Sequence, residues 1–216
     1  MRTTRHRVFG FLSTTVTAVL LLVLVPTAPA AAAVPPAIPT KATAQSQLNG
    51  LAVRSEGASS GYDRSLFPHW VTISGTCNAR EYVLRRDGSN VRTDDQCRAT
   101  SGSWYSEFDG ISTNDPSTFD IDHLVPLAEA WRSGADKWST TKRRDFANDV
   151  DSPVLWAVTA SSNRVKGDKD PAEWMPPRTA IHCAYAKAWI NVKYRYSLAV
   201  NSSEKSALQS TLNNRC

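Results

Sequence analysis

The sequence predicts an α+β fold that is linked by disulfide bonds. Two short apolar runs, 117–125 and 152–160, are typical of buried strands, and the segment between them carries helix signals. A helical turn follows the second run directly, and further helical patterns lie on both sides of this region. The order strand, helical insertion, strand, helix therefore predicts the α+β class.

Residues 1–33 have the composition of a secretory signal peptide. "MRTTRHRVFG" carries three arginines and no acidic residue, "VTAVLLLVLV" is a short apolar run, and "PTAPAAAA" is rich in small residues. An apolar run of about ten residues is too short to span a bilayer as a helix, which takes ~20 residues. We therefore expect cleavage after Ala33, a secreted (extracellular) product and no stable membrane association after cleavage.

The charge balance by itself gives little support for a polyanionic partner. The chain has 25 lysines and arginines against 20 aspartates and glutamates, which is a net charge of +5. Three of the basic residues, Arg2, Arg5 and Arg7, lie in the expected signal, so the exported chain carries a formal charge of +2. Any affinity for nucleic acid must then come from local clusters of cations.

The exported chain is expected to contain a leader and one domain. Residues 34–60 begin as a Pro/Ala-rich spacer, with one weak helix around 42–53. Residues 61–216 are expected to form a single domain with a sizeable core, present as a monomer.

An even number of cysteines in an exported chain predicts two disulfides, with three pairings open. We favour Cys77–Cys97 and Cys183–Cys216 because each closes a short local loop. A zinc site is the rival interpretation, but no CxxC or HxxxH spacing supports one.

Local signals predict the remaining elements. Pro126 suits the first turn of a helix, and Asn-x-x-Glu patterns at Asn78 and Asn201 are typical of helix starts. The expected elements are a helix from Asn78, hairpin strands within 97–110, a strand at 117–125, a helix over 126–134, a helix within 139–149 capped by Ser139, a strand at 152–160, a helical turn near 161–166, and helices over 180–196 and 201–212.

Three side chains near the two apolar runs can carry chemistry together. Asp122 and His123 stand at the end of the first run, and Asn163 opens the helical turn after the second. A hard cation takes oxygen ligands from Asp122 and Asn163, and His123, with an unperturbed pKa of ~6.5, can take a proton from an attacking water. Arg164 and Lys166 could then position a phosphate backbone. The alternatives are a hydrogen-bonded core histidine and, for Asn163, a helix cap.

Longer stretches of the chain resemble a known family. "DIDHLVP", followed by a strand and "SNRVKGD", resembles the ββα-metal core of HNH endonucleases. The chain is most similar to secreted bacterial HNH endonuclease family proteins, which are related to the C-terminal HNH domain of GmrSD-type restriction enzymes. The similarity covers roughly residues 60–216 and includes "GTCNAREYVLRRDG", "SGSWYSEFDG", "LVPLAEAWRSGADKW", "FANDV", "AVTASSNRVKGDKDPAEWMPP" and "YAKAWINVKYRYSLAV".

The resemblance implies a fold, a reaction and site residues. The fold would be a ββα-metal core with a helical insertion and flanking helices. His123 would be the general base, and Asp122 and Asn163 would hold one divalent cation, Mg²⁺ first, with Mn²⁺ and Ca²⁺ as alternatives. The products would carry 5′-phosphate ends. Arg80 and Glu81 become candidates for phosphate binding, because the resemblance includes their helix. The implied partner is DNA, with RNA as a second class, and low sequence specificity is expected because no base-reading motif is evident.

One position departs from the family pattern. The family's middle Asn ties the core together before the second strand, but "NDVDSPVLW" has no Asn at the expected spacing. Asn148 and Asp151 are the candidates for this role. The departure leaves open an alternative function, a catalytically silent nucleic-acid or surface-binding module on the same fold. A different exported hydrolase would need a nucleophile, and the chain has no G-x-S-x-G elbow.

Overall fold

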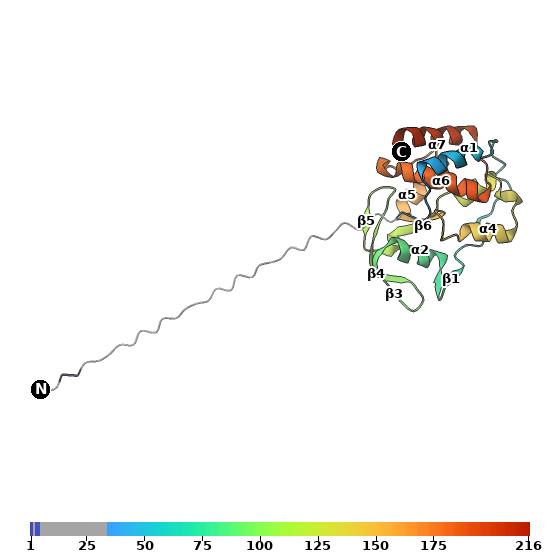
Figure 1. Ribbon diagram of the computed structural model, residues 1–216. Coiled ribbons are helices and arrows are strands. Elements are labelled where there is room, and N and C mark those ends of the chain that lie inside the picture. Colours follow the sequence, from blue (N-terminus) through green and yellow to red (C-terminus); the bar gives the residue numbers. More distant parts are fainter. Residues whose placement is uncertain (2, 5–33) are drawn as a thin grey trace.

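The computed structural model describes residues 1, 3, 4 and 34–216, so the expected signal peptide lies almost entirely outside the described residues. The described part is a mixed α+β structure with small antiparallel sheets, seven α-helices and two disulfides (Figure 1). None of the helices in this part is long and apolar enough to cross a membrane.

The helices are α1 Lys41–Gly50, α2 Ala79–Asp87, α3 Leu127–Arg132, α4 Thr140–Ala147, α5 Ala160–Lys166, α6 His182–Tyr196 and α7 Ser202–Arg215, with short 3₁₀ helices η1 Arg64–Leu66, η2 Pro116–Thr118, η3 Ala135–Lys137 and η4 Thr179–Ile181. The strands are β1 Thr72–Ser74, β2 Cys77–Asn78, β3 Ser89–Thr93, β4 Ala99–Tyr105, β5 Ser112–Thr113, β6 Phe119–His123 and β7 Leu155–Thr159.

Strands β6 and β7 form the sheet that organises the predicted site. They pair antiparallel, with Phe119 opposite Thr159 and His123 opposite Leu155. The connection between them contains α3 and α4, and α5 follows β7 directly and contacts both strands. The predicted order of strand, helical insertion, strand and helix is confirmed.

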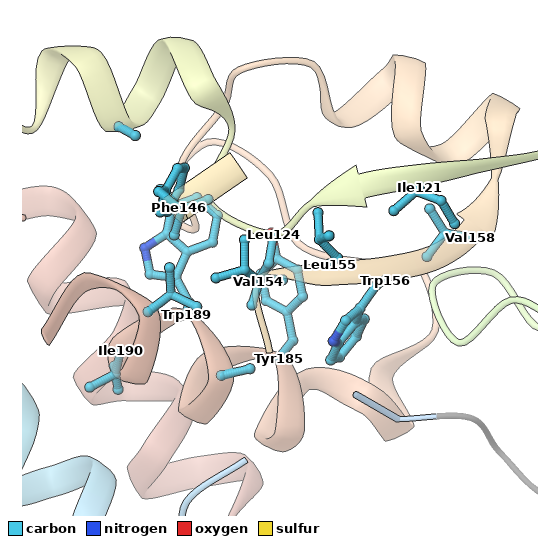
Figure 2. Close-up of a cluster of buried hydrophobic side chains, with 14 of the residues drawn as sticks. Ile121, Leu124, Phe146, Val154, Leu155, Trp156, Val158, Tyr185, Trp189 and Ile190 are labelled. Atoms are coloured by element: carbon cyan, nitrogen blue, oxygen red, sulfur yellow. The ribbon is translucent and has the colours of Figure 1, made fainter. Parts of the chain in front are cut away.

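The hydrophobic core lies between this sheet and α6. Side chains of β6, β7 and the intervening connection, among them Leu124 and Val154, gather against α6 (Figure 2). Tyr185, Trp189 and Val192, which recur at helical spacing along α6, are fully buried. The helical periodicity in the sequence therefore identified the buried face of α6 correctly.

The expected leader takes part in this core. Helix α1 packs against α6 and α7 at one end of the molecule (Figure 1), and its Ala44 and Leu48 are fully buried. Gln45 Nε2 also donates to Gln209 Oε1 over 2.7 Å. The weak helix expected around 42–53 is present, but its apolar side chains belong to the same core as α6, which the spacer interpretation did not anticipate.

Helix caps follow the sequence signals in most places. Ser139 caps α4, and Asn201 and Glu204 form a complete capping box at α7, which runs on to Arg215. Asn78 caps α2, but the Glu81 side chain pairs with Arg80 and does not close a second box. Pro126 occupies the cap position of α3 and not the first turn.

The two disulfides join the favoured pairs. Cys77–Cys97 connects β2 to the turn before β4, and Cys183–Cys216 connects the start of α6 to the end of α7. The pairs are separated by 20 and 33 residues in the sequence, so both are the local closures that the spacing favoured.

Candidate active site

A cavity of about 250 Å³ opens at the end of β6. Asp122 and His123 line it from β6, and Asn163 lines it from α5. Adjacent strand residues normally point to opposite faces, but here the strand ends at His123, so both residues reach one cavity. The structure thus brings together the three side chains that the sequence singled out. Tyr62, Arg64 and Asp168 also line the cavity.

His123 is held by a backbone hydrogen bond. Its Nε2 lies 2.9 Å from the carbonyl oxygen of Ala147 at the end of α4. Because a carbonyl can only accept, Nε2 carries the hydrogen, and Nδ1 of the neutral ring is left as the acceptor. The side chain is only 5% exposed, and this burial lowers the pKa of His123 to about 3. The imidazole is therefore neutral at physiological pH with Nδ1 unprotonated, and burial makes it a weaker base than an exposed histidine.

Aromatic rings surround the imidazole. Trp70 lies 5.6 Å from His123, centroid to centroid, at an interplanar angle of 34°. The Phe146 ring of α4 is closer to parallel, at 6.5 Å and 25°, and His69 meets the imidazole edge-on at 6.4 Å. These contacts restrict how the ring can tilt.

Asp122 forms a buried ion pair with Lys166 of α5. Lys166 Nζ donates to Asp122 Oδ1 at 2.8 Å and to the His123 carbonyl oxygen at 3.1 Å, and the lysine is fully buried. The predicted phosphate contact of Lys166 is therefore wrong, because the end of α5 turns the ammonium inward onto two acceptors of β6. Burial raises the pKa of the Asp122 carboxyl and lowers the pKa of Lys166, while the ion pair opposes both shifts.

Asn163 does not cap helix α5. The side chain that caps α5 is Thr159, whose hydroxyl accepts from the backbone nitrogen of Ser162. Asn163 Nδ2 instead donates to Asp120 Oδ2 at 3.0 Å, which leaves the amide oxygen as its metal-binding atom. Asp120 stands two positions before Asp122 and so shares its face of β6.

The donor atoms at the cavity suit a hard divalent cation. Asp122 Oδ2 is buried and has no hydrogen-bond partner in the described part of the chain, and the Asn163 amide oxygen comes from the facing helix. No group of three or more His, Cys, Asp or Glu side chains within the described residues is arranged to hold a metal ion. Mg²⁺ commonly binds through one or two protein oxygens and otherwise keeps water or substrate phosphate as ligands. Asp122 and Asn163 fit that pattern.

Asn148, one of the two candidates for the missing middle Asn, joins two segments of the domain by hydrogen bonds. Its Nδ2 donates to the carbonyl oxygens of Pro68 and Arg144 at 2.8 and 2.7 Å, and its Oδ1 accepts from the Val71 backbone nitrogen at 3.0 Å. It directly follows Ala147, whose carbonyl holds His123. Asp151, the other candidate, is exposed.

Three other predicted residues lie outside the cavity. Arg80 and Glu81 form an ion pair with each other at 2.7 Å and line a different hollow, next to Arg98 and Pro116. Arg164 is exposed on α5 and does not line the cavity. The helix that carries Arg80 and Glu81 packs on β7 through other side chains, so its place in the domain does not bring this pair to His123.

Sequence reasoning missed Asp120, Arg64 and Asp168. The signal for Asp120 was present, because a residue two positions before Asp122 in a strand shares its face. Asp168 follows the C-terminal Gly167 of α5, and a helix end close to the site could have indicated it. Arg64 comes from η1, in a segment with no motif, so only the three-dimensional structure places it here.

Comparison with known proteins gives one family and one relative. The family model described as GmrSD restriction endonucleases, C-terminal domain, matches residues 79–210. A protein from the fungus Arthroderma benhamiae, described as an uncharacterized secreted protein, is 55% identical over 196 residues, which is 91% of this chain and 96% of the relative. No solved structure matches the chain.

The relative bears on two expectations. Similarity over nearly its whole length, together with the two disulfides, shows that this chain is a secreted protein, as the sequence predicted. The expected bacterial branch is too narrow, because this relative comes from a fungus.

Proposed function

This chain belongs to the GmrSD restriction endonuclease C-terminal domain family, and from that membership we propose that it is a secreted, metal-dependent endonuclease. Its substrate is DNA, with RNA as a second class, and its sequence specificity is low. The observation that carries the proposal is the convergence of Asp122, His123 and Asn163 on one cavity. Asp122 and His123 come from β6 and Asn163 comes from α5. With β7 between them in the chain, these elements follow the order strand, antiparallel strand, helix of a ββα-metal (HNH) core.

His123 is the general base of the proposed reaction. Its Nε2–H is committed to the Ala147 carbonyl, so Nδ1 takes a proton from the water that attacks phosphorus. The bond between phosphorus and the 3′ oxygen breaks, and that oxygen takes a proton from solvent water, which leaves a 5′-phosphate and a 3′-hydroxyl end. The hydrogen bond and the packed rings keep the imidazole in one orientation during this transfer.

Asp122 and Asn163 would hold the cation, through Oδ2 and the amide oxygen. When bound, Mg²⁺ supplies a positive charge that stabilises the phosphate and the leaving oxygen. Lys166 balances the charge of Asp122 from the core side and Asp120 orients the Asn163 amide. Both therefore support the ligand pair without touching substrate.

Arg64 is the proposed phosphate contact. Among the residues that line the cavity in the described part of the chain it is the one lysine or arginine, and its side chain is exposed. The other charged side chains there, Asp122 and Asp168, are acidic and would repel a polyanion without it. Arg164, exposed on α5, is a weaker candidate because it does not line the cavity.

Cleavage of supercoiled plasmid and of a structured RNA by the oxidised secreted protein tests the proposal. Mg²⁺, Mn²⁺ and Ca²⁺ would each be compared with excess chelator. We expect metal-dependent nicking that yields 5′-phosphate ends, and a loss on the order of 10²- to 10⁴-fold for His123→Ala. His123→Asn, which keeps a donor group at this position, controls for folding. Cleavage by both variants at the wild-type rate would overturn the role of His123.

The alternative is a catalytically silent nucleic-acid or surface-binding module. Its first support was the absence of an Asn at the expected spacing, and the hydrogen bonds of Asn148 to Val71, Pro68 and Arg144 weaken that support. The small exposed fraction of His123, 5%, still favours it. Salt-sensitive DNA binding with no cleavage under any of the three cations would decide for this alternative.

A further inference from the structure

Trp70 has an unusual backbone conformation for its residue type. Its φ angle is +60°, in the left-handed region, which is a genuine outlier for a bulky side chain. Such strain persists only where the surrounding structure holds it, and it is concentrated at functional sites. A glycine would adopt this angle without strain, so the presence of an indole here requires an explanation.

Hydrogen bonds on both sides hold Trp70 in place. Asn148 donates to the Pro68 carbonyl, two residues before it, and accepts from the Val71 nitrogen, directly after it. The His69 ring nitrogen Nδ1 lies 2.7 Å from the Phe67 carbonyl oxygen. The segment 67–71 is therefore fixed to Asn148, at the end of α4, at two points and has one further contact within itself.

The same end of α4 also holds His123. Ala147 accepts the imidazole N–H, and the next residue, Asn148, clamps the Trp70 segment. The result is an indole 5.6 Å from the imidazole, tilted by 34°. Two adjacent residues thus restrain the His123 ring. Ala147 does so by a hydrogen bond, and Asn148 does so by holding the Trp70 segment, whose indole packs on the imidazole.

We infer that Trp70 is a positioning residue for His123, and that its left-handed backbone serves to place the indole against the imidazole. A general base must keep its acceptor nitrogen within hydrogen-bond reach of the attacking water. One hydrogen bond at Nε2 leaves the ring free to tilt about that contact. The indole is the nearest of the three rings that restrict this freedom, the other two being those of Phe146 and His69. The catalytic part of the inference rests on the proposed nuclease function, while the ring placement does not.

Three substitutions distinguish the effect of the indole ring from the effect of the strained backbone. Trp70→Phe keeps an aromatic ring at this position, Trp70→Ala removes the ring and keeps the strained backbone, and Trp70→Gly removes both. Trp138→Ala is the matched control, because Trp138 packs on Phe146 at 5.5 Å and not on His123. We expect kcat to fall roughly 10- to 100-fold in the Ala and Gly variants. KM should stay unchanged in both, and Trp70→Phe should restore most of kcat.

The second readout is independent of catalysis. NOEs between the imidazole protons of His123, assigned by comparison with His123→Asn, and the protons of Ala147 report the orientation of the imidazole, which loss of the indole ring current alone does not change. We expect these NOEs to change in Trp70→Ala and Trp70→Gly and to stay the same in Trp138→Ala. The Gly variant should also unfold at higher urea than the Ala variant, because it relieves the strain.

The outcomes separate the two proposals. If the wild type cleaves no nucleic acid, the proposed function fails, and the NOEs of the imidazole protons still decide whether Trp70 sets the ring. If those NOEs do not change in Trp70→Gly, the inference is overturned even where cleavage is slow. A loss of kcat in Trp138→Ala equal to that in Trp70→Ala would likewise overturn it.

Discussion

Two lysines of this domain are fully buried, and their surroundings differ in one respect. Lys193 of α6 donates to Glu129 Oε1 and Ser133 Oγ at 2.6 Å each, to the Ala199 carbonyl at 2.9 Å and to Glu204 Oε2 at 3.2 Å. Lys166 of α5 has two acceptors, and its partner Asp122 keeps an oxygen that no described group satisfies.

The difference indicates what each cluster does. The Lys193 cluster joins α3, α6 and α7 with its polar atoms paired, which is what a buried charge needs for stability. The Lys166 cluster is incomplete at Asp122, a residue that also lines the cavity. A buried charge with one unpaired oxygen beside a cavity is therefore the better guide to function than buried charge alone.

The largest expected effect is on the free energy of unfolding, and it distinguishes the Lys193 cluster from the Lys166 cluster. Lys193→Met should lower the free energy of unfolding by about 3–5 kcal/mol, because Glu129 and Glu204 are left buried without a cation. Urea unfolding monitored by tryptophan fluorescence measures it. Adding Glu129→Gln and Glu204→Gln to the same chain should recover much of the loss. A cost below about 1 kcal/mol for Lys193→Met would show that the cluster is not a structural one.

The next effect is on activity. Asp122→Asn keeps an acceptor for Lys166 but removes the charge that faces the cation, so the rate of plasmid cleavage should fall on the order of 100-fold. The free energy of unfolding should change by less than in Lys193→Met. Parallel measurement of cleavage rates and urea unfolding makes the comparison. An unchanged cleavage rate, or a stability loss as large as for Lys193→Met, would contradict the distinction between the two clusters.

The Lys193 cluster should also give stability a pH dependence. Burial raises the pKa of Glu204 to about 7, above the value of 4.5 for an exposed glutamate, and the carboxylate of Glu129 adds to the shift while Lys193 opposes it. The folded state then holds a proton that the unfolded state releases. The contribution of Glu204 is present in full below pH ~4.5 and is lost as pH rises to ~7, by about 3 kcal/mol at most.

Glu204→Gln isolates this contribution from the titration of other groups. Urea midpoints of the wild type and the variant, measured between pH 4.5 and 7.5, should diverge as pH rises, with the wild type becoming relatively less stable. Parallel curves over this range would show that Glu204 titrates no differently in the folded and unfolded states.

The smallest effect concerns the mouth of the cavity. Arg64→Ala should raise KM for DNA roughly 10-fold and make binding less dependent on salt, because one phosphate contact is lost. Arg164→Ala, which removes an exposed arginine outside the cavity, should change KM less. The comparison is made from initial rates at two salt concentrations. Equal effects of the two variants would mean that the cavity lining does not decide phosphate binding.

Much of the fold could be predicted because its signals are local. The strands β6 and β7 carry short apolar runs, Ser139 and Asn201 are capping residues, and helix α6 has clear periodicity. Each disulfide closes a short loop. In every one of these cases the information lies within a few residues, or a few tens of residues, of the element that forms.

The features that the sequence did not predict depend on contacts between segments that are distant in the chain. Lys166 looks like a solvated cation on α5, and its burial is decided by Asp122, 44 residues earlier in the chain. Arg64 reaches the cavity from a segment without a motif, and Asn148 finds Pro68 and Val71 only in the folded domain. The meeting of Asp122 and Asn163 at one cavity was predictable because the strand and the helix that carry them have strong local patterns.

The packing of α1 has a consequence for how the chain folds. Residues in and just after α1 contact residues in and just before α7. Gln45 forms a hydrogen bond with Gln209, 164 positions later in the chain, and Val53 pairs with Val200. Strands β6 and β7 likewise pair across the whole of α3 and α4. Non-local contacts of this kind slow folding, because long loops must close before the contacts are gained. Helix α1, the first helix in the described part of the chain, thus cannot complete its packing until α6 and α7 have been synthesised.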